Sequence, residues 1–228
     1  MKTLSTQTVR RGYIELLSYL PLLYFTGLMV IISAQYVPIN HQVAFLRVKQ
    51  DVVGLAHYQY AFFIHVYTSI LVLLAGLIQF STFIRLSYPT VHRVAGRWYV
   101  GLILLAASPS GLVMGFYANG GMSAQISFTL LAVLWFGFTY KGYAYARQKQ
   151  WRLHENFMLR SLALTLSAVS LRLFKWVIVS TLALPPMDTY VIVAWAGWVV
   201  NWLLVEYYIY RRSQRVRARL VDGQQTSL

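Results

Sequence analysis

The sequence predicts an all-α integral membrane protein, a polytopic bundle of about six transmembrane helices. Of its 228 residues, 58% are hydrophobic and only 11% are charged, whereas a soluble domain carries roughly a quarter charged residues. The mean hydropathy is +0.54. The apolar residues also gather into runs of about 20, the length that crosses a hydrocarbon core of roughly 30 Å. We therefore expect residues 1–228 to form a single integral membrane domain.

The apolar runs give the order of the helices. The first run is long enough to span a bilayer and lacks the small-residue cleavage pattern of a signal peptide. Turn-forming residues separate the later runs, with Pro38 and Pro89 before the second and third, Gly120-Gly121 before the fourth and Pro185-Pro186 before the sixth. The predicted spans are 14–34, 60–82, 95–117, 125–145, 157–183 and 189–210.

Basic residues predict the orientation, because cytoplasmic segments of membrane proteins are enriched in Lys and Arg. The N-terminus, the second-to-third and fourth-to-fifth connections and the C-terminus hold fourteen basic residues; the opposite segments hold only Arg47 and Lys49. We expect both termini inside (N-in/C-in) and a location in the cell inner (cytoplasmic) membrane. The basic tail, 211–228, should contact anionic lipid headgroups. The fourteen are Lys2, Arg10, Arg11, Arg85, Arg93, Arg97, Arg147, Lys149, Arg152, Arg211, Arg212, Arg215, Arg217 and Arg219.

Charge and cysteine content exclude several classes of function. The basic residues behind the net charge of +14 lie mostly in the short segments between apolar runs, not on one face of a folded domain, so we expect no nucleic-acid partner. The chain has no cysteine, which excludes disulfides, thiolate metal sites and cysteine nucleophiles. No Ser/His/Asp set, HExxH motif or phosphate-binding glycine loop is recognisable. Catalytic residues remain unknown, whether the protein is an enzyme stays open, and we predict no metal site.

Polar residues inside the predicted spans are candidates for function, because ionisable groups are costly in a bilayer. Along the fifth span four polar residues and one alanine follow spacings of 7, 4, 3 and 4 and share one helix face, with Lys175 close to it. The second span carries a similar face from His65 to Gln79, and the third one from His92 to Ser110. The fifth-span residues are His154, Ser161, Thr165, Ala168 and Arg172.

Depth along the helices predicts two clusters. His92 and His154 stand at the inner starts of their helices, whereas His65, Arg172 and Lys175 lie in the outer halves of theirs. Simpler interpretations stay open. The two inner histidines would also suit the headgroup interface, and Arg172 and Lys175 could extend to the outer interface. We expect Glu206 to pair with a nearby arginine.

Three segments resemble the bacterial predicted membrane proteins grouped as domain of unknown function 2306. They are FIHVYTSILVLLAGLIQF (63–80), HRVAGRWYV (92–100) and LHENFMLRSLALTLSAVSLRLF (153–174). The resemblance implies a helical membrane fold and emphasises His92, Arg93, Arg97, His154 and Arg160, but it supplies no substrate. A looser similarity is to membrane cytochromes b, in which histidines on neighbouring helices hold haem.

Three functions remain. The first is electron transfer to or from quinone through one haem b, held by His92 and His154, with Arg93, Arg97 and Arg160 pairing with propionates. The second is binding or transport of a small anion, lipid or quinone by His65, Ser161, Thr165, Arg172 and Lys175. The third is an accessory or assembly role beside a partner protein, in which the polar faces only join helices.

Overall fold

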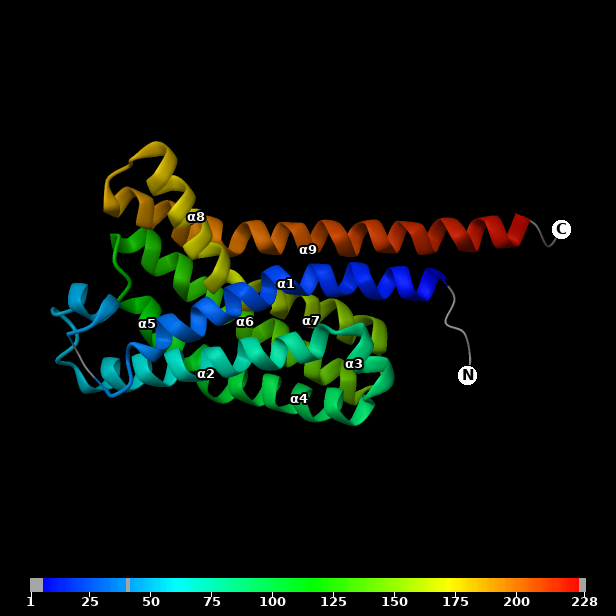
Figure 1. Ribbon diagram of the computed structural model, residues 1–228, viewed down its shortest axis with the longest axis horizontal. Coiled ribbons are helices and arrows are strands. Elements are labelled where there is room, and N and C mark those ends of the chain that lie inside the picture. The colour runs from blue at the N-terminus through cyan, green and yellow to red at the C-terminus, as the bar shows by residue number, and fades with distance from the viewer. Residues whose placement is uncertain (1–5, 40–41, 226–228) are drawn as a thin grey trace. The chain divides into compact units, whose positions relative to one another are not determined.

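The computed structural model describes residues 6–39 and 42–225, with side chains described for 19–39 and 42–218. Throughout these residues the regular structure is helical (Figure 1). The elements are α1 (Thr6–Ala34), η1 (Ala44–Val48), α2 (Ala56–Phe80), α3 (Thr82–Ser87), α4 (Pro89–Leu102), η2 (Ile103–Ala107), α5 (Ser108–Phe116), α6 (Gly121–Arg147), α7 (Trp151–Thr165), α8 (Ser167–Leu182) and α9 (Pro186–Gln225).

The all-α membrane fold class is confirmed. Four segments are long and apolar enough to cross a bilayer: Ala56–Phe80, Pro89–Phe116, Gly121–Arg147 and Pro186–Ala218. The bent pair α7 and α8 makes a fifth if it is one span. The predicted first span, 14–34, lies on α1. The part of α1 whose side chains are described, Tyr19–Ala34, is a shorter apolar helix. The count of six and the inside location of both termini therefore stay predictions.

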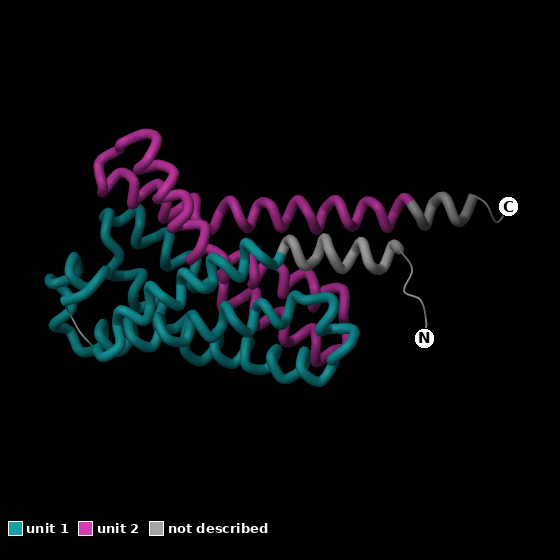
Figure 2. Tube along the Cα trace, viewed as in Figure 1, with its two compact units in different colours: residues 1–133 teal, residues 134–228 magenta. Residues whose placement is uncertain are grey.

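The chain divides into two compact units, Met1–Val133 and Leu134–Leu228 (Figure 2). The helix α6 passes from the first unit into the second. The expectation of a single membrane domain over the whole chain stays a prediction.

In the first unit, α2 is the central helix. It packs against α1, α4, η2 and α5. The third span is one helical path from Pro89 to Phe116, interrupted by the π-helical segment η2. Pro109 lies two residues after the end of this segment, in the first turn of α5. Because proline lacks an N–H and its ring clashes with the carbonyl four residues earlier, the wider π turn is the expected accommodation.

The connection between α1 and α2 in the first unit folds into a small packed cap. Tyr36, Leu46, Val53, Tyr58 and Phe62 form one buried apolar cluster. The described part of this connection contains only the short 3₁₀ helix η1 and turns.

Lys49 is buried in that cap, only 3% exposed. Its ammonium donates a hydrogen bond to the Tyr117 carbonyl. Burial lowers the pKa of Lys49, and the nearby Asp51 carboxylate partly opposes the shift. In the sequence Lys49 is one of two basic residues in the connection between the first two spans, and nothing there indicates that it is buried.

In the second unit, the predicted fifth span, 157–183, is not one straight helix. It consists of α7 and α8, which meet at Leu166 with a bend of 41°. The bend contains neither proline nor glycine. Both helices pack against α9. Asn201 of α9 bonds residues on both sides of the break.

Candidate functional site

His65 on α2 is bonded to a neighbouring helix at the π segment. Its Nδ1 lies 2.8 Å from the Ala107 carbonyl oxygen of η2. Since a carbonyl only accepts, Nδ1 carries the proton. Gly111 on α5 makes room for the ring, because a Cβ there would lie 2.9 Å from His65 Cε1. His65 thus bonds a helix next to its own.

Gln79 and His92 link the C-terminal end of α2 to the N-terminal end of α4. The Gln79 amide donates to the His92 backbone carbonyl. Gly96, one turn further along α4, permits this contact, because a Cβ there would lie 2.8 Å from Gln79 Oε1. Arg93 and Arg97 are exposed on α4, and Arg93 donates to the Thr90 hydroxyl at 3.1 Å.

His154 is the corresponding histidine of the second unit. Its Nδ1 lies 2.8 Å from the Gly142 carbonyl oxygen on α6, so Nδ1 again carries the proton. In the neutral ring Nε2 then keeps its lone pair, and it makes no hydrogen bond to any residue in the described ranges. This arrangement fixes the ring orientation and leaves one nitrogen able to bind a metal or accept a proton.

Ser161 and Thr165 join α7 to α6. The Thr139 and Ser161 hydroxyls lie 2.7 Å apart, and the Trp135 indole donates to the Thr165 hydroxyl at 3.0 Å. Thr165 in turn donates to the Ser161 carbonyl. The predicted inward face of these residues exists, and its hydroxyls act as contacts between helices.

Arg160 on α7 forms a two-point ion pair with Glu206 on α9. Arg160 Nε and Nη2 lie 2.5 and 2.8 Å from the two carboxylate oxygens. The Trp202 indole adds a third donor at 2.9 Å, and the guanidinium lies 4.9 Å from the centre of the Phe157 ring. The expectation that Glu206 pairs with an arginine is confirmed. In contrast, the Arg160 guanidinium, which the sequence predicts to pair with a haem propionate, is already bonded to Glu206.

Asn201 on α9 bridges the break between α7 and α8. Its amide nitrogen donates to the Ala163 carbonyl at 3.1 Å, and its oxygen accepts from the Ser170 hydroxyl at 3.0 Å. One side chain thus binds the last turn of α7 and the first turn of α8. A side chain inserted into the hydrogen-bond ladder is a recognised cause of a helix bend.

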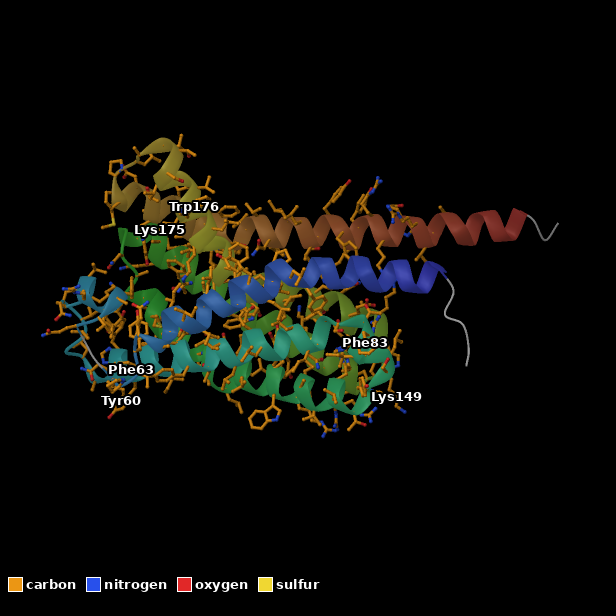
Figure 3. All side chains as sticks on the ribbon, in the orientation of Figure 1. Tyr60, Phe63, Phe83, Lys149, Lys175 and Trp176 are labelled. Carbon is orange, nitrogen blue, oxygen red and sulfur yellow. The ribbon has the colours of Figure 1, made fainter. Side chains whose placement is uncertain are left out.

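Arg172 and Lys175 lie beyond the break, on α8. Both are exposed, and Arg172 donates to the Ala168 carbonyl of its own helix at 2.8 Å. Figure 3 labels Lys175 together with the exposed Trp176. Because the helix bends at Leu166, these two cations do not continue the straight polar face of His154, Ser161 and Thr165. Ser161 and Thr165 are buried on α7, whereas Arg172 and Lys175 are exposed on α8, and a joint role of these residues stays a prediction.

A comparison with known protein families identifies the family of this chain. The family described as predicted membrane protein (DUF2306) matches residues 62–209, more than half of the chain. The chain belongs to this family. The match extends beyond the segments that suggested it, taking in Asn201 and Glu206 on α9. No curated protein and no solved structure matches the chain.

Sequence reasoning missed the residues that complete these contacts. Trp135, Thr139 and Asn201 are polar groups in apolar spans, and that alone was a signal available in the sequence. Their partners lie 22 to 38 positions away along the chain, and helical spacing within one span cannot identify them. His92 belongs to the first unit and His154 to the second, so their joint role remains the sequence's prediction.

Proposed function

We propose that the protein is a membrane electron carrier that binds one haem b, with His154 as an axial ligand. The observation that carries the proposal is the hydrogen bond from His154 Nδ1 to the Gly142 carbonyl. An axial histidine binds iron through one ring nitrogen while the other is held by an acceptor, commonly a backbone carbonyl. A bound haem would supply one-electron transfer, with quinone as the partner expected from the sequence.

The remaining predicted ligands fit this proposal unequally. His92 is the second axial ligand that the sequence suggests. Arg93 and Arg97 are exposed; their pairing with propionates stays a prediction of the sequence, and the proposal does not depend on it. Arg160 already bonds both oxygens of Glu206, so the proposal does not use it.

The test is a dithionite-reduced minus air-oxidised absorption spectrum of the detergent-purified protein, expressed with haem precursor. We expect sharp Soret and α bands that His154→Ala abolishes and His92→Ala abolishes or shifts. His57→Ala is the matched control, because His57 is exposed and bonds only the Tyr117 hydroxyl, at 2.7 Å. A flat spectrum from folded protein, or bands unchanged in His154→Ala, would contradict the proposal.

A second candidate is an accessory or assembly role, and a different observation favours it. Ser161, Thr165 and Asn201 bond neighbouring helices, as expected if the polar faces hold a scaffold together. This candidate predicts a larger complex that survives extraction in mild detergent and contains a second polypeptide at fixed ratio. The chain alone at one copy per particle, together with a haem spectrum, would favour the first candidate instead.

A further inference from the structure

An apolar groove runs along the first unit between α2 and α4. Its volume is about 600 Å³. Leu71, Ala75 and Ile78 form the α2 wall, and Val94, Trp98 and Leu102 belong to the α4 wall. Trp98 is 65% exposed and Val94 46%, whereas Ala75 lies buried at the base, where its small side chain leaves the space open. The groove is distinct from the contacts of His65 and His154.

One end of the groove is basic. Thr90, in the first turn of α4, is the polar member of the lining. Its hydroxyl accepts a hydrogen bond from Arg93, and Arg97 follows one turn later. From Thr90 to Leu102 a helix rises about 18 Å, close to the roughly 15 Å thickness of one leaflet of the hydrocarbon core. The groove therefore has the length of one leaflet. Arg93 lies near the Thr90 end, where headgroups would lie, and Arg97 lies about 10 Å further along α4 than Thr90, a position from which its long side chain can extend toward that end.

We propose that this groove binds one acyl chain of an anionic phospholipid, whose phosphate group contacts Arg93, Arg97 and the Thr90 hydroxyl. An apolar groove alone would accept any lipid tail. The arginines add selection for negative charge, because a guanidinium presents several donors to a phosphate. The basic end lies on the side that the positive-inside pattern assigns to the cytoplasm, where anionic lipids gather.

Trp98 allows a direct test, because bromine atoms on a lipid chain quench a tryptophan that they touch. The full-length protein is reconstituted into phosphatidylcholine vesicles containing a small fraction of brominated phosphatidylglycerol, or of brominated phosphatidylcholine for comparison. We expect the anionic probe to quench at the lower mole fraction. Trp98→Phe, which isolates the contribution of this tryptophan among the seven, should remove that preference.

Two variants distinguish the contribution of the arginine charges to lipid binding from that of the shape of the groove. Arg93→Gln with Arg97→Gln should lower the relative affinity for the anionic probe up to about 30-fold, about fivefold for each basic residue at a membrane surface. Val94→Phe should weaken quenching at Trp98 by filling the groove while keeping both arginines. The control, Arg147→Gln with Arg152→Gln, removes the same charge from two other exposed residues and should preserve the preference.

Three outcomes would overturn the proposal. Equal quenching by the two probes in the wild type would show that the groove does not select anionic lipid. An unchanged preference in the arginine variant would place the selection elsewhere. If Trp98 is not quenched by either probe, protein rather than lipid covers the groove.

Discussion

At the scale of single residues, the Arg160–Glu206 pair is the more shielded of the two ion pairs in the described part of the second unit. The Arg160 and Glu206 side chains are 18% and 36% exposed, against 39% and 36% for the pair of Arg212 with Glu155. Trp202 also donates to the Glu206 carboxylate, and Phe157 faces the guanidinium. Removing one partner of a shielded pair leaves a charge without compensation.

We expect Glu206→Gln to lower the free energy of unfolding by about 1–3 kcal/mol, reduced from the value for a fully buried pair because Glu206 is partly exposed. Thermal unfolding in detergent, followed by circular dichroism, measures the loss. Glu155→Gln is the control and should cost under about 1 kcal/mol. Adding Arg160→Met to Glu206→Gln should recover part of the loss. Equal losses for the two glutamates would show that Arg160 is not specially shielded.

The sequence predicted which residues face inward but not what they contact. Spacings of three and four placed Ser161 and Thr165 on one face, and the structure confirms that both are buried. Their partners, Thr139 and Trp135, come from another span. Only packing of the two helices determines which polar groups meet, and a single sequence does not contain that geometry.

At the scale of helices, two departures from regular α geometry separate what the sequence reveals from what it hides. The π segment before Pro109 has a local cause that the sequence displays. The bend at Leu166 has none, because its stabilising residue, Asn201, lies on α9, 38 positions from Ala163. A sequence therefore reveals a helix break that has a local cause, but it does not reveal a break stabilised by a side chain far away along the chain.

The close approach of α2 and α5 gives a prediction about Gly111. A methyl group there would lie 2.9 Å from His65 Cε1, so Gly111→Ala should cost about 1–3 kcal/mol of unfolding free energy through overpacking. The cost should shrink in a His65→Ala background, where the ring is absent. The control is Gly101→Ala on the same span, where no atom lies within 4 Å of the added Cβ. That variant should be neutral or stabilising by up to about 1 kcal/mol. A similar loss at both glycines would contradict this packing.

At the scale of the whole molecule, the exposed surface is that of a protein surrounded by lipid. Within the most apolar windows of the four long spans only 22–39% of residues are buried. Large apolar side chains such as Leu105 (85% exposed) and Met122 (75% exposed) lie on the surface. Apolar surface of this extent would promote aggregation in water, whereas in a bilayer it meets hydrocarbon and carries no such cost.

The orientation in the bilayer is the prediction that follows from charge. Because the chain lacks cysteine, a single introduced cysteine reports its own side of the membrane through a membrane-impermeant maleimide. Gln148, Gln214 and Asp188 are exposed positions, the first two in predicted inner segments and Asp188 in a predicted outer one. In intact cells Asp188→Cys should be labelled, and Gln148→Cys and Gln214→Cys only after permeabilisation. Cysteine-free wild type gives the background. Labelling of Gln214→Cys in intact cells while Gln148→Cys stays protected would contradict the two spans predicted between these positions, because an even number of spans returns the chain to the same side.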